Sequence, residues 1–458
     1  MNEYFPMVIK LKQFFATGKT LSVEFRKQQL LGLKQAILKN EENIYQALFS
    51  DLKKSKEEAW ITEIGFVLNE INVALKNLDH WAKSKKVSTN LINLPSSSSV
   101  HSEPIGAVLV IAPWNYPFQL LFAPLVGAIA AGNCCVLKPS ELAPHTSAIM
   151  HKIIEAAFPK EYVLLLEGEG HEVIPNLIHA DLVDCVFFTG SSKIGKLVYT
   201  MAAEHLLPVT LELGGKSPCV IDASADIKIA AKRVAIAKFS NCGQMCVAPD
   251  YLLVHSSVKE LFIKEIIHCI KLFFGENDSN NYQYGKIINE KHFDRLVGFL
   301  KSGNVLHGGN TNRETLYFEP TVLDAVDLNS ELMQEEIFGP ILPIISYSAH
   351  EEAMLLIKKH PNPLAFYIFS ASSESQKTWL KNVPSGGACI NNASWHLTNP
   401  NLPFGGRGFS GIGKYHGQFS FQTFSHFKAI LKTPTWFDPA FKYPPFKGKL
   451  KWFKKILG

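Results

Sequence analysis

Three residue types that could perform catalysis lie where apolar segments of this sequence end. Cys246 lies in NCGQMCVAPDY (241–251), a Gly-containing loop between a predicted helix and a predicted strand. Glu212 ends an apolar strand directly before two glycines, and Asn115 follows another apolar strand. A thiolate can act as a nucleophile, a carboxylate as a general base and an amide N–H as a donor to an oxyanion. Each residue alone also fits core packing or a turn, but together they supply the groups that nucleophilic catalysis needs.

The cysteines follow neither a metal-binding nor a disulfide pattern. Three residues separate Cys242 from Cys246, which does not match a C-x-x-C pair, and no second cysteine or histidine pair of suitable spacing follows. We therefore expect no metal. Scattered cysteines in a long chain are typical of reduced thiols. The eight are Cys134, Cys135, Cys185, Cys219, Cys242, Cys246, Cys269 and Cys389.

Two strand-end turns are candidates for dinucleotide binding. FTGSSKIG (188–195) reads as a strand, a Gly-Ser turn and a helix, whose exposed N–H groups and dipole favour phosphate. It lacks the full GxGxxG fingerprint, and an ordinary helix cap is the alternative. KPSE (138–141) follows an earlier strand, at the edge where open α/β sheets bind ligands. Lys138 and Glu141 could hydrogen-bond ribose hydroxyls, although these four residues alone fit a solvated turn better.

Alternating strands and helices must position these residues. The first 80 residues have helical spacing, and from Gly106 onward apolar strands alternate with helices over short connections. Such repeated β-α-β units predict an open, mostly parallel sheet, and a second α/β series begins after Gly215. The apolar run 117–137 is interrupted by Pro124 and lacks flanking charged anchors. We expect a buried helix and a strand there rather than a membrane span.

Composition indicates a folded protein without a nucleic-acid surface. The 458-residue chain is 47% hydrophobic and 19% charged, which argues against disorder over most of its length. Its formal charge is +5, but six lysines follow the last acidic residue, Asp438. Without them 40 basic residues face 41 acidic ones, so the body is neutral and only the tail is basic. We expect no nucleic-acid partner, because such a partner needs a basic surface on the folded domain.

Two segments lie outside the alternation. Residues 86–104 are polar, contain four consecutive serines and have no helical period, so we expect an exposed arm or hairpin, with a flexible linker as the alternative. Residues 433–458 are rich in proline, lysine and aromatic residues. The N-terminal MNEYFPMVIKLKQFF lacks the features of a signal peptide, so we expect a cytoplasmic protein.

Seven motifs occur in order along the chain: APWNYPF, LKPSE, FTGSSKIG, LELGGKSP, GQMCVAPDY, EEIFGP and LPFGGRGFSGIGKYHG. Together they resemble the aldehyde dehydrogenase superfamily, over about Trp60 to Pro445. HSEPIG, CVAPDY, YHG with SFQTFSH, and KYPP are similar to the class 3 and fatty aldehyde dehydrogenase branch. The departures are Cys242 and Met245 beside the nucleophile and a shorter link through the arm, and neither changes the expected chemistry.

The resemblance implies NAD(P)-dependent oxidation of an aldehyde, aromatic or medium- to long-chain aliphatic, to the carboxylic acid. Cys246 would attack the aldehyde carbon to form a hemithioacetal. The Asn115 side chain and the Cys246 backbone N–H would stabilise its oxyanion, by roughly 3–4 kcal/mol per donor. Loss of hydride to the nicotinamide would leave a thioester, which water activated by Glu212 would hydrolyse. No histidine flanks Cys246, and the family relation implies that Glu212 also helps to prime the thiol.

The resemblance also implies a cofactor site. Lys138 and Glu141 are expected at the adenosine ribose, because a carboxylate accepts from the 2′- and 3′-hydroxyls and repels a 2′-phosphate. NAD is therefore the expected cofactor, with NADP as an alternative. Ser191 is expected at the pyrophosphate, Glu336 at the nicotinamide ribose and Phe338 at the nicotinamide ring. The expected cofactor-binding residues are Trp114, Lys138, Glu141, Gly190, Ser191, Gly195, Glu336 and Phe338.

The expected architecture is the α/β aldehyde dehydrogenase fold, with a Rossmann-like cofactor domain, an α/β catalytic domain and a small β oligomerisation arm. We assign 1–85 and 105–213 to the NAD(P)-binding domain and 214–395 to the catalytic domain. We assign 86–104 and 396–432 to the arm, and 433–458 to a basic tail. The resemblance implies a homodimer, with the arm and the region after Trp395 crossing between subunits.

The tail sequence KGKLKWFKKILG (447–458) has apolar residues at helical spacing between lysines. A basic amphipathic helix can lie on an anionic membrane surface, which would suit aldehydes delivered from lipid. The alternative is a short helix packed on the enzyme body near the substrate entrance, as in fatty aldehyde dehydrogenases. Peripheral membrane contact is therefore a hypothesis here.

Three rival functions remain at this point. A CoA-acylating aldehyde dehydrogenase would not need Glu212, and a CoA-independent turnover assay distinguishes it. A cysteine hydrolase or esterase would need only Cys246 and Asn115, without the dinucleotide motifs. A catalytically silent, membrane-associated scaffold would fail to bind NAD. Retention of all three catalytic residue types argues against the last.

Overall fold

A computed structural model describes residues 4–275 and 281–457. Six strands form the first sheet, in the order β17-β7-β6-β3-β4-β5. Five of them run parallel and β17 is antiparallel. β3, β4 and β6 are buried at every residue, which explains their continuous apolar sequences. The bounds are β3 Ala107–Ile111, β4 Cys134–Lys138, β5 Val163–Leu165, β6 Cys185–Thr189, β7 Val209–Glu212 and β17 Gly411–Ile412.

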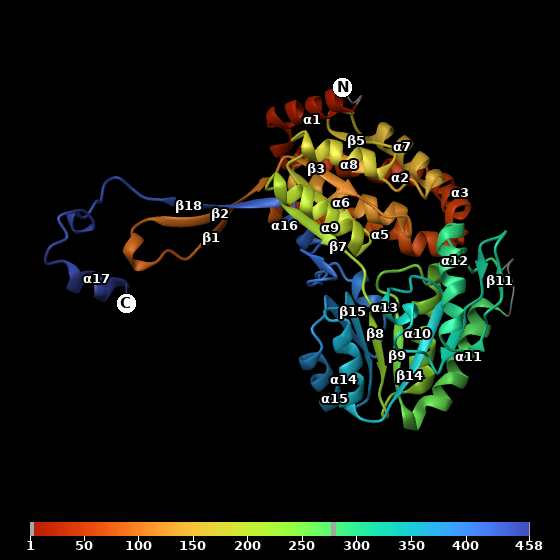
Figure 1. Cartoon of the computed structure of the whole chain (residues 1–458). Helices are drawn as coiled ribbons and strands as arrows, with labels where there is room; N and C mark the ends of the chain where they lie inside the picture. The colour runs from red at the N-terminus through yellow and green to blue at the C-terminus, as the bar shows by residue number, and fades with distance from the viewer. Residues whose placement is uncertain (1–3, 276–280, 458) are drawn as a thin grey trace.

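Helices surround this sheet in the upper body of Figure 1. Within the first 80 residues, the helical spacing continues through Asn40, but the structure has two helices there, α2 and α3. The Asn40 side-chain amide donates to Ala36 O at 2.9 Å and so competes with continued helix. The apolar run 117–137 forms the fully buried α6 and then β4, as expected. The helices are α1 Phe5–Ala16, α2 Val23–Lys39, α3 Glu41–Leu52, α4 Lys56–Ala59, a π-helix Trp60–Ile64, α5 Gly65–Trp81, α6 Pro117–Ala131, α7 Pro144–Ala157, α8 Gly170–His179 and α9 Ser192–Glu204.

Seven strands form the second sheet, in the order β10-β13-β14-β9-β8-β15-β16, and only β10 is antiparallel. The strands are β8 Pro218–Ile221, β9 Tyr251–His255, β10 Asn304–His307, β13 Thr321–Asp324, β14 Ile341–Tyr347, β15 Ala365–Phe369 and β16 Gly387–Ile390. The helices are α10 Ile227–Phe239, α11 Lys259–Phe274, α12 Glu290–Phe299, α13 Glu331–Gln334, α14 His350–Lys359 and α15 Ser373–Asn382. A small hairpin pairs β11 Thr311–Asn312 with β12 Tyr317–Phe318.

Three antiparallel strands form an arm that extends away from both sheets (Figure 1). They are β1 Lys85–Val87, β2 Ser97–Pro104 and β18 Ser425–Lys432, and α16 Gln418–Thr423 precedes β18. The expected arm in 86–104 is thus a pair of strands. Beyond β18 the chain continues to α17 Leu450–Leu457, at the far end of the arm (Figure 1).

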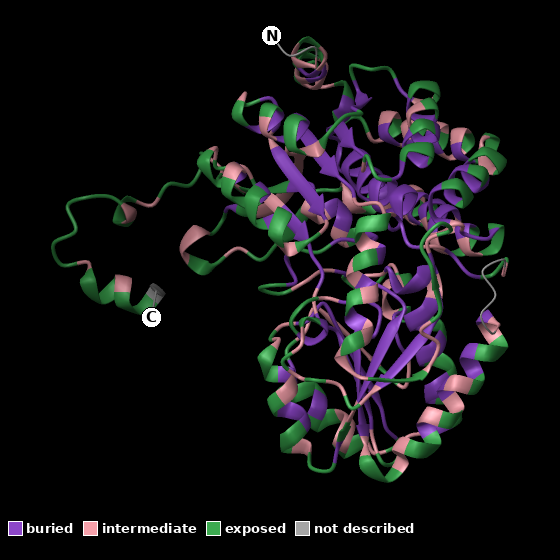
Figure 2. Ribbon diagram, turned by 45° about the vertical axis from the view of Figure 1, so that its right-hand side comes forward, coloured by how far each residue is buried: buried purple, intermediate pink, exposed green. Residues whose placement is uncertain are grey.

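Burial divides the molecule in the same way. The strands of both sheets are buried, whereas the arm and the chain after it are largely exposed (Figure 2). In the described part of the chain, no helix has the length and apolar character needed to cross a membrane.

The span 396–432 contributes to more than one unit. β17 pairs with β7 in the first sheet, whereas β18 pairs with β2 in the arm. We therefore propose a narrower arm, consisting of residues 85–104 and 425–432.

Candidate active site

The loop that carries Cys246 begins with a strained backbone after α10. Asn241, Cys242 and Gly243 all have positive φ angles, of 50°, 51° and 70°. A Cβ on Gly243 would collide with the carbonyl oxygen of Gly339, so only glycine fits there. Residues other than glycine rarely adopt positive φ angles. Two such residues, Asn241 and Cys242, lie shortly before the half-buried Cys246, and strained backbone of this kind is typical of a functional site.

Hydrogen bonds tie this loop to the loop of Asn115. The Asn115 side-chain amide donates to Gln244 O at 3.0 Å, and the Asn241 amide donates to Asn115 O at 2.8 Å. The Gln244 side chain accepts from Ile288 N at 3.0 Å. One hydrogen-bond network thus joins the Asn115 loop to residues 241–244, directly before Cys246.

A buried ion pair supports Asn115. Lys54 and Glu63 are 2.6 Å apart, and neither side chain is exposed. Lys54 also donates to Asn115 O at 3.0 Å and lies 3.8 Å from the centre of the Tyr116 ring. Glu63 accepts from Gln119 N at 2.8 Å, in the first turn of α6. Because every charge is bonded, the pair fixes the start of α6 and the loop before it.

The Glu212 carboxyl is buried at the end of β7. Neither of its oxygens has a hydrogen-bond partner within the described residues. Burial raises the pKa of this carboxyl well above its ordinary value. An unpaired buried polar group is costly and rare, so this one requires a reason other than stability.

The Cys246 thiol lies within electrostatic reach of two carboxyls. Its pKa is raised to about 12, chiefly by burial and then by the Glu336 and Glu212 carboxylates. As a residue Cys246 is nevertheless only half-buried, whereas all the other cysteines except Cys389 are buried. The thiol is therefore neutral at rest and needs a base to become a nucleophile.

Glu336 lies against the glycines that follow Glu212. A Cβ on Gly214 would collide with the Glu336 carboxylate, so the glycine at this position makes the approach possible. The pKa of Glu336 is raised to about 8, first by burial and then by Asp250. Arg295 donates to Glu336 O at 3.2 Å, which holds the backbone of this segment.

A second buried ion pair connects three of the motifs. Lys216 donates to the Asp250 carboxylate, to Leu332 O at 2.8 Å and to Glu335 O at 2.7 Å. Asp250 accepts from Ile337 N at 2.8 Å. The segments LELGGKSP, CVAPDY and EEIFGP are thereby joined around the thiol.

Lys138 and Glu141 lie together at the carboxyl end of β4. The buried Lys138 ammonium donates to Pro139 O at 2.6 Å and to the Glu141 carboxylate at 3.1 Å. A Cβ on Gly170, the first residue of α8, would lie 3.9 Å from the Glu141 oxygens. The pair thus lies beside the N-terminus of α8, with a carboxylate oxygen available to a ligand.

The expected phosphate turn lies at the end of β6. Ser191 caps α9 by accepting from Ile194 N at 3.4 Å. A Cβ on Gly195 would collide with Leu213, and one on Gly190 with the Phe188 ring, so both glycines permit close packing. The first turn of α9 therefore packs directly beside the segment that follows Glu212, where helix N–H groups favour phosphate.

Trp114 and Phe338 lie near each other although 224 residues separate them. Their rings form an edge contact with centroids 5.3 Å apart, and Trp114 also contacts His292 at 5.1 Å. Phe338 has a φ of 47°, a strained conformation for an aromatic residue. Both rings are half-buried, which is typical of residues that line a ligand site.

These residues fit NAD(P). The helix N-terminus of α9 suits a pyrophosphate, the Lys138–Glu141 pair suits a ribose, and the buried Thr189 hydroxyl at the same sheet edge has no partner among the described residues. The structure thus brings Cys246, Glu212 and Glu336 together. It also bonds the Asn115 side chain to Gln244, in the loop that carries Cys246. Lys138, Glu141 and Ser191 lie along the neighbouring carboxyl edge of the first sheet.

Some residues around the thiol were not anticipated from sequence. Tyr116, Tyr367 and Tyr415 are buried, and Cys246 contributes to raising the pKa of each, after burial. Tyr367 donates to Val247 O at 2.5 Å, next to the nucleophile. Tyr367 lies in a buried strand, so in the sequence it looks like a core residue. Tyr116, inside APWNYPF, and Tyr415, inside LPFGGRGFSGIGKYHG, lie in motifs that could have suggested them.

The chain was compared with known proteins. A sequence model of the aldehyde dehydrogenase family matches residues 8–430. The chain is 47% identical to 4,4'-diaponeurosporen-aldehyde dehydrogenase of Staphylococcus aureus, over 97% of each protein. It is 40% identical to the dimeric, NADP-preferring aldehyde dehydrogenase of Rattus norvegicus, over 98% of this chain and 99% of that one. A solved structure of Staphylococcus aureus AldH in a substrate-bound state matches with a TM-score of 0.97 at 45% identity and covers 100% of both chains.

This chain therefore belongs to the aldehyde dehydrogenase family. It is an oxidoreductase that converts aldehydes to carboxylic acids with NAD(P) as its cofactor. The expected family, α/β fold and reaction are confirmed, and the hydrolase and silent-scaffold alternatives are set aside.

Proposed function

We propose that Cys246 is the nucleophile of this enzyme, that Asn115 donates to the substrate oxygen and that Glu212 is the general base. The unpaired, buried Glu212 carboxyl near the half-buried Cys246 carries the proposal. The other half-buried cysteine, Cys389, lies 3.3 Å from Nδ1 of His396 instead.

In the first step, the ionised Glu212 takes the proton from the Cys246 thiol. The sulfur then forms a bond to the aldehyde carbon, and the carbonyl electron pair moves to oxygen. One N–H of the Asn115 amide donates to Gln244 O, which leaves its second N–H for this oxyanion. Because burial raises the pKa of Glu212, its carboxylate is a stronger base than an exposed one.

NAD(P), when bound, supplies a nicotinamide ring that accepts a hydride. The residues that would hold it are Lys138 and Glu141 at the adenosine ribose, the turn Gly190–Ser191 with Gly195 at the pyrophosphate, Glu336 at the second ribose, and Trp114 and Phe338 near the ring.

Before the last step, Glu212 releases the thiol proton to solvent and is ionised again. It then takes a proton from water as the water oxygen attacks the carbonyl carbon of the Cys246 thioester. The C–S bond breaks, the carboxylic acid leaves, and the proton held by Glu212 returns to the sulfur and restores the thiol. The same carboxyl thus acts twice, which explains why it is not paired with any fixed donor.

Glu212→Gln tests the assigned base, with Cys246→Ser as the test of the nucleophile. We expect Glu212→Gln to accumulate the acyl-enzyme on Cys246 at alkaline pH, where solvent can remove the thiol proton, as measured by intact mass. Cys246→Ser should lower kcat by a factor of roughly 10³ or more. Cys389→Ser is the matched control and should keep its activity. A Glu212→Gln enzyme that turns over at the normal rate would contradict the proposal.

We also propose a homodimer formed through the arm. In the described chain β18 pairs with β2 alone, so its other edge offers backbone N–H and C=O groups to a second chain. The name of the Rattus norvegicus relative describes that protein as dimeric.

Finally, we propose that the tail contacts membranes and that the substrates are aromatic or medium- to long-chain aldehydes. Trp436 is 78% exposed and Trp452 is 64% exposed, and Trp452 lies among lysines. Exposed tryptophan beside lysine suits the interface of an anionic bilayer. The protein should co-sediment with vesicles containing phosphatidylserine but not with phosphatidylcholine alone. Unchanged co-sedimentation after deletion of residues 447–458 would remove the basis of the proposal.

A further inference from the structure

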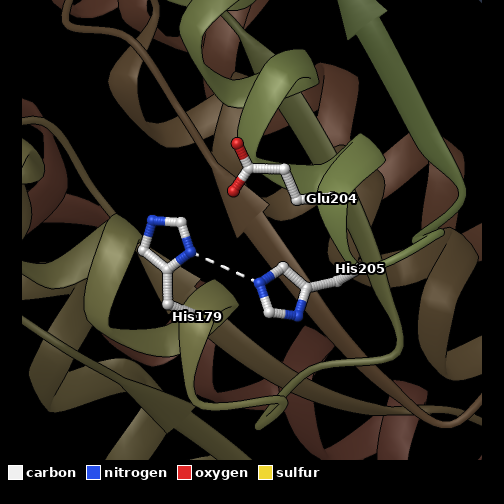
Figure 3. Close-up of side chains that lie close together, drawn as sticks. All are labelled: His179, Glu204 and His205. Atoms are coloured by element: carbon white, nitrogen blue, oxygen red, sulfur yellow. Dashed lines mark hydrogen bonds between the residues drawn. The ribbon is translucent and has the colours of Figure 1, made fainter.

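A cluster of two imidazoles and a carboxylate lies outside the active site. His179 is the last residue of α8, Glu204 is the last residue of α9, and His205 follows it. One ligand atom from each lies within 4.8 Å of the other two, and the three side chains converge (Figure 3). Among the residues that the structure describes, this is the one group of three histidine, cysteine or acidic side chains with such a convergence.

The His205 ring is held in a defined orientation by a carboxylate. Its Nδ1 lies 2.7 Å from the Asp181 carboxylate, which favours the proton on Nδ1. Nε2 is then unprotonated, and its lone pair faces Nδ1 of His179 in a ring-to-ring hydrogen bond of 3.3 Å (Figure 3). Asp181 is itself fixed, because Lys12 donates to its backbone oxygen at 3.1 Å. A carboxylate behind an imidazole is the common arrangement around metal-binding histidines.

The distance between the two nitrogens suits a shared metal ion. Two nitrogens bound tetrahedrally to zinc at about 2.0–2.1 Å lie about 3.3–3.4 Å from each other. The observed 3.3 Å between His179 Nδ1 and His205 Nε2 needs almost no adjustment. A hydrogen bond between the two rings would also have this length, but it gives no role to Glu204.

The electrostatics of the helix ends also favour a bound cation. All three residues lie at helix C-termini, where the dipole favours a cation and disfavours an anion. Glu204 is therefore unfavourable at this position by itself, and a bound cation would offset both its charge and the partial charges of the carbonyls.

We propose that His179 Nδ1, His205 Nε2 and a Glu204 carboxylate oxygen bind a divalent transition-metal ion of the zinc type. Two imidazoles and one carboxylate are a common ligand set for Zn²⁺, and water completes the coordination at this exposed position. The metal joins the ends of α8 and α9, which begin at Gly170 and Ser192 beside the proposed cofactor residues. Its role is structural, because the ion joins two helices and contacts none of the proposed catalytic residues.

The test measures Zn²⁺ binding to the chelator-treated full-length protein by competition with a chromophoric chelator. The cysteines can also bind Zn²⁺, so each variant is compared with the unmodified chain. His205→Gln and Glu204→Gln should each lose one equivalent of Zn²⁺. Asp181→Asn should weaken that equivalent roughly 10- to 100-fold, because it removes only the group behind the ligand. Asparagine tolerates the left-handed backbone at Asp181, so this variant should fold.

His171→Ala is the matched control, because His171 is an exposed histidine of the same helix that lies near carboxylates but outside the cluster. It should bind as much Zn²⁺ as the unmodified chain. Equal stoichiometry and affinity in His205→Gln, Glu204→Gln and the unmodified chain would overturn the proposal and leave a ring-to-ring hydrogen bond. An anomalous peak at the zinc edge beside His179 in crystals would support it, and peaks at cysteines alone would also overturn it.

Discussion

At the scale of single residues, two groups with raised pKa values set the direction of the pH dependence. Burial raises the pKa of the Cys246 thiol to about 12, and it also raises the pKa of the Glu212 carboxyl well above its ordinary value. Glu212 acts as a base only when ionised, and its ionised fraction rises with pH. The thiolate fraction rises with pH for the same reason.

We therefore predict that kcat/KM increases as the pH rises from about 6 to about 9. The measurement is the initial rate over this range at saturating cofactor and limiting aldehyde. In Glu212→Gln, the part of the increase in kcat/KM that depends on this base should disappear. The remaining increase with pH should then follow ionisation of the Cys246 thiol alone. A rate that falls between neutral and alkaline pH would contradict the assignment of both groups.

We propose that a single residue, Glu141, also influences cofactor choice. The Glu141 carboxylate lies 3.1 Å from the Lys138 ammonium, so a 2′-phosphate would meet one negative and one positive group. Replacing Glu141 with Gln removes the repulsion and leaves the attraction. We predict that Glu141→Gln shifts the NAD to NADP ratio of kcat/KM roughly tenfold toward NADP, equivalent to about 1.4 kcal/mol. Glu169→Gln, on the nearby loop, is the control, and an unchanged ratio in Glu141→Gln would count against a ribose role for this carboxylate.

At the scale of elements, the buried pair of Lys54 and Glu63 joins the N-terminal helices to α6. Removing the Lys54 charge leaves Glu63 buried without its partner, which typically costs about 3–5 kcal/mol. We predict that Lys54→Met lowers the free energy of unfolding by about 3 kcal/mol, at the low end of that range because Glu63 can become protonated. Denaturant unfolding measures this value. The double variant Lys54→Met, Glu63→Gln should recover part of the loss, and the pair is not structural if the single variant is as stable as the unmodified chain.

The element scale also explains what could be predicted from sequence. β3, β4 and β6 are buried on both faces, so their apolar runs and the helices between them were recognisable. The short strands β13 and β16 carry little such signal, and the break at Asn40 depends on one side-chain hydrogen bond.

The candidate site was predictable only where it lies in contiguous motifs. Cys246, Glu212 and Asn115 each lie in a recognisable motif, and their catalytic roles stay a prediction. The Lys54 contact with Asn115 spans 61 residues, and the approach of His179 to His205 spans 26. No local spacing encodes these contacts, because packing of separate helices creates them. The expectation of no metal rested only on the spacing of cysteines and histidines along the sequence. Such spacing does not reveal residues that the packing of separate helices brings together.

At the scale of the whole molecule, the arm has an apolar face that a single chain leaves exposed. On β18, Phe427 is 47% exposed and Leu431 is 50% exposed, and alternation along the strand puts both on the same face. Lys428 and Lys432 occupy the opposite face, where Lys428 pairs with Glu103. An exposed strand with one apolar face and an open edge is a favourable dimer surface and an aggregation hazard when alone.

We predict that the double variant Phe427→Glu, Leu431→Glu converts the dimer to a monomer, because the new carboxylates would be buried opposite their own copies. Light scattering coupled to size-exclusion chromatography measures the mass directly. Lys432→Gln lies on the same strand but on the opposite face, so it should remain dimeric. If the double variant stays dimeric, the dimer contact lies elsewhere; if the unmodified chain is already a monomer, the arm has another role. Because the site residues all come from the two sheets of one chain, a folded monomer should keep measurable activity, which separates loss of assembly from loss of chemistry.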